Sequence, residues 1–385
     1  MIGQPAGVPE QDKRDGNEEA EIMSSKRKSR QLLDRFYVGV RMMSPARYKA
    51  KYARKRIKMI NGGYNGSLKE FNEVVVSYWK KYGVIPKKYW YDIYCAGSDH
   101  YDPRYIPDDM WYQTICPHFC RYQSTGCLSN KGMFDRVFPN VRQPETVVKN
   151  MGGCYYTAGN ELIDKETAVR LCLAEEKLII KACGLSGGGR GVQVLNGSEM
   201  DEESVGRLFD QYDSGFVLQR FLKQHKDLAA IHEKSINTVR VITFLFHGKV
   251  YVLSAQLRMG VGDSDVDNVS AGGIACTIKE DGWLAETAVT RKSEWSDHHP
   301  NGMKFKDIRV PSYDRIVAKA VELQSSMPFL GIIGWDFAVA EDGEPIMIEF
   351  NTPCNQNQIG GKAPTFGDLT DQVLDDVFHK KTAKK

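Results

Sequence analysis

The sequence has no long uninterrupted apolar run. No stretch reaches the roughly 18 consecutive apolar residues that a membrane-spanning helix needs. Residues 1–30 are polar and charged, without the apolar core of a secretory signal. The nine cysteines are scattered along 385 residues rather than set at the short spacings of a disulfide framework. No period of roughly 20–50 residues repeats. These absences argue against a membrane-spanning protein, a small secreted domain and a solenoid, and they favour reduced thiols in a cytoplasmic protein.

The composition is that of an ordinary globular protein, with 42% hydrophobic and 26% charged residues and a net charge of +3. Residues 1–25 are rich in Gly, Pro and acidic residues, which predicts a disordered tail. Residues 26–60 carry thirteen Lys or Arg residues against one acidic residue, Asp34. This basic segment could make weak contact with an anionic membrane surface or an acidic partner. A solvated helix face is the plainer and preferred interpretation, and no nucleic-acid partner is expected.

The rest of the chain divides into three regions. Residues 26–125 form an N-terminal helical and aromatic-rich region whose topology the sequence does not assign. From residue 126 onward strands and helices alternate, and most of the strands suit antiparallel pairing. The spacing predicts helices at 166–175, 202–212 and 312–326. It predicts strands at 178–182, 192–195, 216–219 and 274–278, and hairpins at 239–257 and 332–350. We therefore expect an α+β fold.

A lysine followed by a glycine-rich loop is the first chemical signal. Lys181 ends an apolar strand, and a buried lysine is costly unless an anion meets it. The loop that follows runs from Gly184 to Gly191, and its backbone N–H groups could approach phosphate oxygens closely. No Gly-Lys-Ser/Thr closes the loop, so it is not a Walker A motif. A flexible hairpin with a surface lysine is the alternative.

The hairpin at 332–351 is the second signal. Its first strand carries Asp336, and its second strand carries Glu349 and Asn351, which share one face because they are two residues apart. Two carboxylates and an amide oxygen are hard ligands suited to Mg²⁺ that bridges nucleotide phosphates. Solvent-facing acids on an edge strand are the alternative. However, Glu349 interrupts a strongly apolar strand, which favours a functional role.

The segment Phe216 to Leu222 is the third and weakest signal. It is apolar, ends in polar residues and leads into a loop. The backbone of such a segment can hydrogen-bond an adenine edge, although from these residues alone a plain core strand is the preferred interpretation.

In this order and spacing the three signals resemble the ATP-grasp superfamily. Further patterns are similar to its sugar-transfer-associated family: Ser235 to Arg240 with Thr243, Asp267-Asn268 with Gly272-Gly273, His299-Pro300 with Gly302, Val310-Pro311, and Ile333 to Asp336. The resemblance covers about 125–360. It implies two α/β lobes with largely antiparallel sheets that sandwich the nucleotide. The central lobe would span 126–222 and the C-terminal lobe 223–385, with the smaller region before them left unexplained.

The resemblance also implies roles for individual residues. Lys131 and Lys181 would bind phosphates, and the adenine and loop contacts would come from Ser186, Gly187, Gly188, Gly189, Gln219, Arg220 and Leu222. Asp336, Glu349 and Asn351 would hold Mg²⁺. Together with Lys181, Arg240 and Arg258 would act at the reaction centre, with structural salt bridges as their alternative role. Many carboxylate ligases of the superfamily have an arginine two positions before the first metal-binding acid, where this chain has Gly334.

The implied activity is that of an ATP- and Mg²⁺-dependent ligase. It would join a small-molecule acid to an amine through an acyl phosphate, with polysaccharide or natural-product biosynthesis as a suggested context. A kinase of a small molecule or sugar is the first alternative, and a non-catalytic nucleotide-binding module is the second. Cys95, Cys116, Cys120 and Cys127 leave a zinc site open, although their spacing does not match a zinc knuckle. The acceptor, the nucleophile and the oligomeric state are not encoded in any motif.

Overall fold

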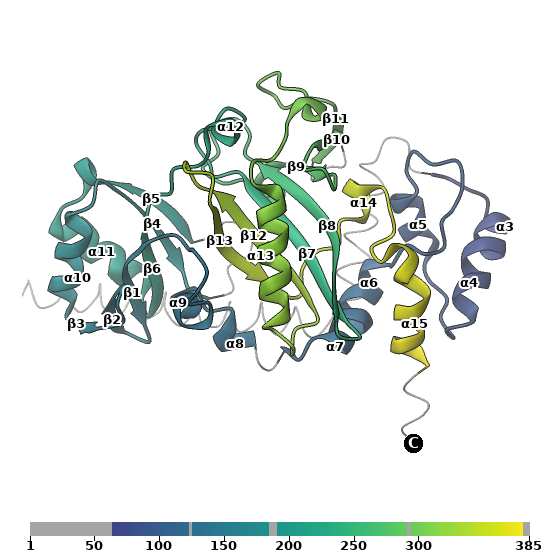
Figure 1. Ribbon diagram of the computed structural model, residues 1–385, viewed down its shortest axis with the longest axis horizontal. Helices are drawn as coiled ribbons and strands as arrows, with labels where there is room; N and C mark the ends of the chain where they lie inside the picture. The colour runs from purple at the N-terminus through teal and green to yellow at the C-terminus, as the bar shows by residue number, and fades with distance from the viewer. Residues whose placement is uncertain (1–63, 123–124, 185–190, 291–293, 380–385) are drawn as a thin grey trace, which may run out of the picture. The chain divides into compact units, whose positions relative to one another are not determined.

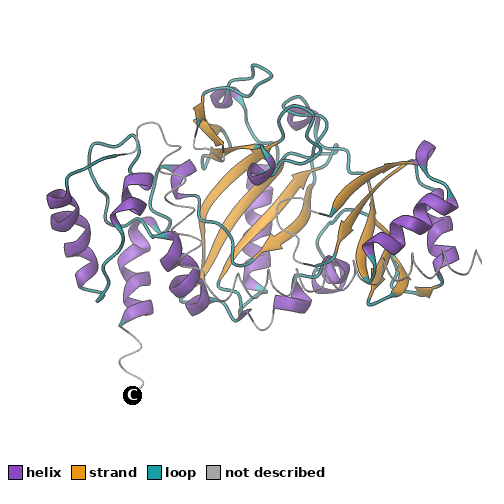
Figure 2. Ribbon diagram, turned by 180° about the vertical axis from the view of Figure 1, so that it is seen from behind, coloured by secondary structure: helices purple, strands orange, loops and turns teal. Residues whose placement is uncertain are grey.

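The computed structural model describes residues 64–122, 125–184, 191–290 and 294–379. The predicted disordered tail, residues 1–25, and the basic segment, residues 26–60, lie outside this part. No helix in these ranges is long and apolar enough to cross a membrane. The described residues form two antiparallel β-sheets with helices packed against them (Figures 1 and 2).

The first sheet has six strands in the order β3-β2-β1-β6-β4-β5, and all neighbours are antiparallel. Its strands are β1 (Thr146–Met151), β2 (Cys154–Thr157), β3 (Leu162–Ile163), β4 (Lys177–Ala182), β5 (Val192–Asn196) and β6 (Gly215–Arg220). Helices α10 (Lys165–Leu173) and α11 (Glu202–Tyr212) lie together beside it (Figure 1). Both begin at aspartates whose carboxylates accept backbone N–H groups, Asp164 from Thr167 and Asp201 from Ser204.

The second sheet has seven strands in the order β11-β10-β9-β8-β7-β12-β13. They are β7 (Thr238–Phe246), β8 (Lys249–Met259), β9 (Ile274–Ile278), β10 (Leu284–Thr290), β11 (Trp295–Ser296), β12 (Ile332–Val339) and β13 (Pro345–Asn351). The turn between β7 and β8 is His247-Gly248, and both residues have positive φ (48° and 79°), as a tight two-residue hairpin requires. Helix α13 (Tyr313–Ser325) packs across β7, β8 and β12 on one face (Figure 1).

The N-terminal region is built from three helical segments, and two of them continue through π-helical turns. The first runs through α3 (Leu68–Phe71), η1 (Asn72–Val76) and α4 (Ser77–Lys80). The second is α5 (Lys88–Tyr94), and the third runs through α6 (Asp108–Met110), η2 (Trp111–Ile115) and α7 (Cys116–Phe119). Their buried aromatic side chains belong to the same hydrophobic core as the seven-stranded sheet. This region is therefore packed onto the C-terminal sheet.

Short helices complete the described part. They are α8 (Thr125–Leu128), η4 (Lys131–Met133), α9 (Phe134–Val137), η5 (Gly197–Glu199), α12 (Lys226–Ala229), η6 (Val269–Ala271), η7 (Phe305–Asp307), α14 (Gln358–Gly361), η8 (Gly367–Leu369) and α15 (Thr370–Phe378). All eight cysteines that the structure describes are free thiols.

The α+β fold with antiparallel sheets is confirmed, and so are the predicted strands, hairpins and helices from residue 165 onward. The prediction missed β1 to β3, β10 and β11, which are short or interrupted by polar residues. The six-stranded sheet has its own hydrophobic core, separate from the larger one. The lobe limits at 126–222 and 223–385 stay predictions.

Candidate active site

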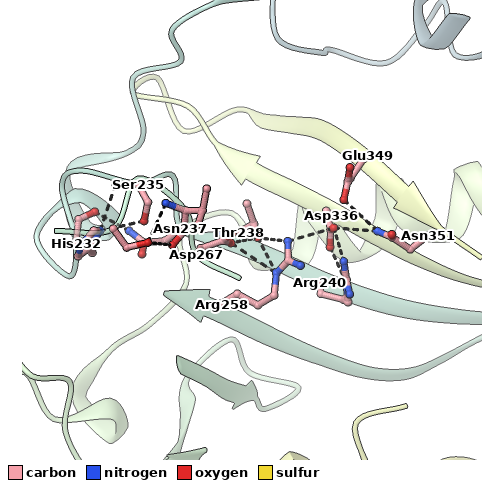
Figure 3. A network of polar contacts seen from close by, with 12 residues as sticks. His232, Ser235, Asn237, Thr238, Arg240, Arg258, Asp267, Asp336, Glu349 and Asn351 are labelled. Atoms are coloured by element: carbon pink, nitrogen blue, oxygen red, sulfur yellow. Dashed lines mark hydrogen bonds and ion pairs between the residues drawn. The ribbon is translucent and has the colours of Figure 1, made fainter. Parts of the chain in front are cut away.

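The predicted metal ligands meet on neighbouring strands. Asp336 on β12 pairs directly with Glu349 on β13, and Gly334 pairs with Asn351. The Asn351 amide nitrogen donates to Asp336 Oδ2 at 3.1 Å and to Glu349 Oε1 at 3.3 Å. Asp336 is fully buried in the middle of the sheet. The hairpin thus brings all three side chains to one point, as the alternation predicted (Figure 3).

Two buried arginines bind the same aspartate. Arg240 on β7 holds both Asp336 oxygens, with Nε donating to Oδ1 at 2.7 Å and Nη2 donating to Oδ2. Arg258 Nη2 on β8 lies 3.1 Å from Asp336 Oδ2. Burial lowers the pKa of Arg240, but Asp336 and Glu349 outweigh burial and raise it overall. Both structural salt bridging and a role at the reaction centre are therefore compatible with these arginines.

Lys131 also contacts this cluster, and it lies in the short helix η4, which packs against β1 and β6 of the six-stranded sheet. Its Nζ lies 3.1 Å from Glu349 Oε2. Asn130 fixes the start of the Lys131 turn, because its side chain accepts the Gly132 N–H at 2.9 Å. Burial raises the pKa of Glu349, yet Lys131, Arg240 and Arg258 together bring it down to about 2. Glu349 is thus held as a carboxylate among cations.

Lys181 on β4 has no counter-ion in the part of the chain that the structure describes. No described carboxylate or hydrogen-bond acceptor contacts its Nζ. Burial and the nearby positive charge of Lys131 lower the pKa of Lys181 to about 8, against a smaller opposite effect from Glu349. A partly buried cation without a partner among the described residues is costly, and an anion bound here would reduce that cost.

Three further residues were given no role from the sequence: Thr238 and Asp267, which appear there only within family patterns, and Lys149, which is not named there. Thr238 Oγ1 accepts from Arg258 Nε at 3.0 Å and from Nη2 at 2.6 Å, and it donates to Asp267 Oδ2. Asp267 also accepts the Thr238 N–H at 3.1 Å. Asp267 lies in the Asp267-Asn268 pattern, but no spacing rule connects it with Arg258. Lys149, the third, interrupts the apolar run of β1, and that interruption is the signal that could have found it.

Lys149 is a buried lysine close to Lys131 and Lys181, the two lysines predicted to bind phosphates. It pairs with Val217 across β1 and β6, and Lys181 pairs with Val217 across β4 and β6. Directly paired residues point to the same face of a sheet, so both lysines lie on one face. Lys149 Nζ is bound to Asp135 Oδ2 at 2.7 Å and to the Gly132 carbonyl at 3.2 Å. It therefore anchors the turn that carries Lys131.

The residues predicted to contact adenine, Gln219, Arg220 and Leu222, lie at and just after the end of β6. Gln219 is buried and its amide is 3.4 Å from the Pro144 carbonyl. The Arg220 guanidinium holds both Glu175 oxygens at 2.8 Å, so its side chain is engaged away from the lysine face. Leu222, with Ile236 and Ile348, packs half-exposed against the small apolar cluster of Ala338, Ala340 and Ile346. Ser186, Gly187, Gly188 and Gly189 lie outside the described residues.

Packing explains why glycine occupies position 334, where many carboxylate ligases of the superfamily have an arginine. A Cβ at this position would lie 2.7 Å from Cys354 Cβ and 3.4 Å from its Sγ. Cys354 follows β13 and is buried against the site. A larger side chain at 334 would therefore displace the segment after Asn351.

Comparison with known families decides the relationship. The family model described as "sugar-transfer associated ATP-grasp" matches residues 127–370, well over half of the chain. The chain belongs to this ATP-grasp family. The resemblance seen in the motifs is confirmed, and the two antiparallel sheets are those of the ATP-grasp fold. A comparison with curated proteins gave no match.

Solved ATP-grasp structures resemble the chain over part of its length. Biotin carboxylase from Campylobacter jejuni is 13% identical, with a TM-score of 0.42 over 65% of this chain and 46% of that one. The L-amino acid ligase from Bacillus licheniformis is 13% identical (TM-score 0.37; 66% and 48% covered). The D-alanyl-alanine synthetase A from Vibrio cholerae is 9% identical (TM-score 0.39; 67% and 66% covered). The chain thus covers about half the length of the first two.

The donor set of this ATP-grasp chain fits Mg²⁺ in part. Glu349 and Asn351 offer hard oxygens at the surface of the cluster, although the Asn351 amide would have to turn its oxygen toward the ion. Asp336 is already neutralised by two guanidinium groups, which makes it the weaker ligand. Among the described residues no three His, Cys, Asp or Glu side chains group as metal ligands, and this includes Cys95, Cys116 and Cys120. The magnesium site stays a prediction.

Proposed function

We propose that the chain is an ATP-dependent ligase that joins a carboxylic acid to an amine through an acyl phosphate. The observation that carries the proposal is the meeting of Lys131, the unpaired Lys181 and the Glu349–Asn351 pair beside two buried arginines. Two lysines of which one lacks a counter-ion suit the phosphates of a nucleotide. Half-exposed Leu222 and Ile348 at the hinge suit the face of an adenine ring.

Each residue has a definite task in this proposal. Lys131 and Lys181 would bind phosphate oxygens, and Lys131 would exchange its contact with Glu349 for the nucleotide. Glu349 and Asn351 would hold Mg²⁺, which when bound would neutralise charge between the terminal phosphates. Arg240 and Arg258 are fixed by Asp336, Thr238 and Asp267 before any ligand arrives. Fixed cations of this kind stabilise developing charge without reorganising.

The proposed reaction has two balanced steps. A carboxylate oxygen of the acid forms a bond to the γ-phosphorus while the bond between that phosphorus and ADP breaks. The amine nitrogen then forms a bond to the acyl carbon, the phosphate leaves with its oxygen, and the amine loses a proton. The product is an amide, with ADP and phosphate released.

Hydroxylamine tests this function without knowledge of the natural amine, because it traps acyl phosphates as coloured iron hydroxamates. The full chain would be incubated with ATP, Mg²⁺, hydroxylamine and a panel of carboxylic acids. We expect ADP and hydroxamate in equal amounts with at least one acid, and neither with Glu349→Gln. If ADP is released without hydroxamate and a phosphorylated alcohol forms, the chain is instead a kinase. The kinase is the second candidate because Gly334 replaces the arginine that many carboxylate ligases have at this position. ATP bound but never turned over would establish a binding module.

A further inference from the structure

A cavity of about 540 Å³ lies at the open edge of β8, just beyond the end of β9. Its walls come from α13 on one side and from residues 357–365, which include α14, on the other (Figure 1). β9 pairs with Gln256 to Met259, so among the described residues the earlier half of β8 has no paired strand on this side. Cavities of roughly 300–1,000 Å³ are typical of small-molecule sites.

The sheet register connects this cavity with the arginines. Arg240 pairs with Gln256, and Gln256 pairs with Thr277, which lines the cavity. Directly paired residues share a face, and strands are about 4.8 Å apart, so Thr277 lies about 10 Å from Arg240 on the same face. Gln256 and Ser254, which are half-buried on that face, make no side-chain hydrogen bond within the described ranges. A row of free polar groups therefore leads from the arginines to the cavity.

The outer wall is fixed by the N-terminal region. Trp111 Nε1 donates to the Cys354 carbonyl at 2.9 Å. The buried Gln358 amide binds both the Ile106 N–H and the Ile106 carbonyl at 2.9 Å. Gln356 Nε2 donates to the same carbonyl at 2.8 Å. Because these bonds join segments about 250 residues apart, the wall is already formed before a ligand binds.

The residues that line the cavity favour a ligand with an apolar body. Its interior is mainly apolar, with Val252, Ala255, Ile278, Val317 and Pro364 among its residues. The hydroxyl groups of Ser254 and Thr277 come from the sheet face that carries Arg240, and the charged groups Lys279, Glu280 and Asp314 carry both signs. An apolar body would be desolvated here at a gain of roughly 25 cal/mol per Å² of buried area. A second carboxylate or a sugar ring would lose solvation against the apolar part of the lining without gaining this burial.

We propose that this cavity is the acid-binding subsite, and that it takes a carboxylic acid with an apolar body whose carboxylate points toward Arg240 and Arg258. The proposal rests on the ligase function above. Octanoate is a suitable probe because it combines one carboxylate with an unbranched apolar body. Glucuronate, a sugar acid with no apolar body, is the contrasting probe.

The test measures probe binding to the full chain loaded with Mg²⁺ and a non-hydrolysable ATP analogue. Ala318→Trp places an indole in the cavity from the exposed face of α13, and Glu322→Trp, one turn further along the helix, is the matched control. Octanoate should bind the wild type and Glu322→Trp alike, and at least tenfold more weakly to Ala318→Trp, with nucleotide affinity unchanged in all three. Glucuronate should bind more weakly than octanoate throughout.

The outcomes separate the two proposals. No octanoate binding, equal binding by Ala318→Trp and the wild type, or a preference for glucuronate would each overturn the apolar subsite. Hydroxamate formation from glucuronate would do the same and leave the ligase intact. If octanoate binds as expected but no acid of the panel yields hydroxamate, the ligase function fails and the cavity stands as a binding site for an apolar acid.

Discussion

Replacing Lys181 by methionine should stabilise the nucleotide-free protein and weaken nucleotide binding. Burial without a counter-ion lowers the pKa of Lys181 from 10.5 to about 8. At about 1.4 kcal/mol per pKa unit, this shift means that the charged lysine lowers the free energy of unfolding by roughly 3 kcal/mol. The side chain keeps some contact with solvent, so this value is an upper limit. Methionine has a similar length and removes the charge.

The sign of the pH dependence follows from the direction of the shift. Below about pH 8 the lysine is charged in both states and the whole cost is present. Between about pH 8 and 10.5 the unfolded chain binds more protons than the folded one, so stability rises with pH. The advantage of Lys181→Met over the wild type should therefore be largest at pH 7 and vanish toward about pH 10.

Thermal melts of the wild type, Lys181→Met and Lys177→Met across this pH range check the prediction. Lys177 lies on the same strand and is exposed, so its variant should melt close to the wild type. Calorimetric titration with Mg-ATP should show Lys181→Met binding about ten- to a hundredfold more weakly, because one charge-assisted contact is lost. A Lys181→Met protein that melts below the wild type at pH 7, or binds ATP equally well, would refute the reasoning.

Four further outcomes are expected. Glu349→Gln should lower ADP release about a thousandfold or more, because it removes a negative charge from the proposed metal shell; turnover near the wild type would end that assignment. Mg-ATP at a hundredfold excess over its Kd should stabilise the fold by about 2.7 kcal/mol, as an upward shift of the melting temperature. Gly334→Ala should cost about 1–3 kcal/mol, and Cys354→Gly in the same chain should recover part of that loss in unfolding experiments. Removal of residues 1–25 should leave ATP affinity unchanged in calorimetry, and a truncated chain that unfolds would contradict the predicted disorder.

The parts of the site that the sequence predicted are those carried by local patterns. Glu349 and Asn351 are two residues apart on one strand, and a short turn returns Asp336 beside them, so alternation alone brought the three together. Lys181 stood out because a lysine in an apolar strand needs a reason. The confirmed strands and helices likewise follow from periodicity within a single element.

Local sequence patterns could not predict contacts between segments that are far apart in the chain. Asp267 reaches Thr238 and Arg258 only because the segment after β8 returns to the strand ends, whereas Thr238 pairs with Arg258 directly across the β7–β8 hairpin. The short strands β3 and β11 have two residues each and carry no period to detect. Trp111 donates to the Cys354 carbonyl, which lies 243 residues further along the chain, and no pattern in either segment predicts this contact. Such pairings are decided by the tertiary fold.

The hydrogen bonds between residues 106–112 and 354–358 have a consequence for how relatives can be recombined. The match to the family begins at residue 127, yet Trp79, Trp90 and Trp111 are fully buried in the same core as β7 and β12. A fragment cut at the limits of the match would leave Phe244 without Phe119 and Phe366 without Trp111. The piece of this chain that can be moved as an intact module is therefore longer than the segment that the family model matches, and it must include the helices from residue 64 onward.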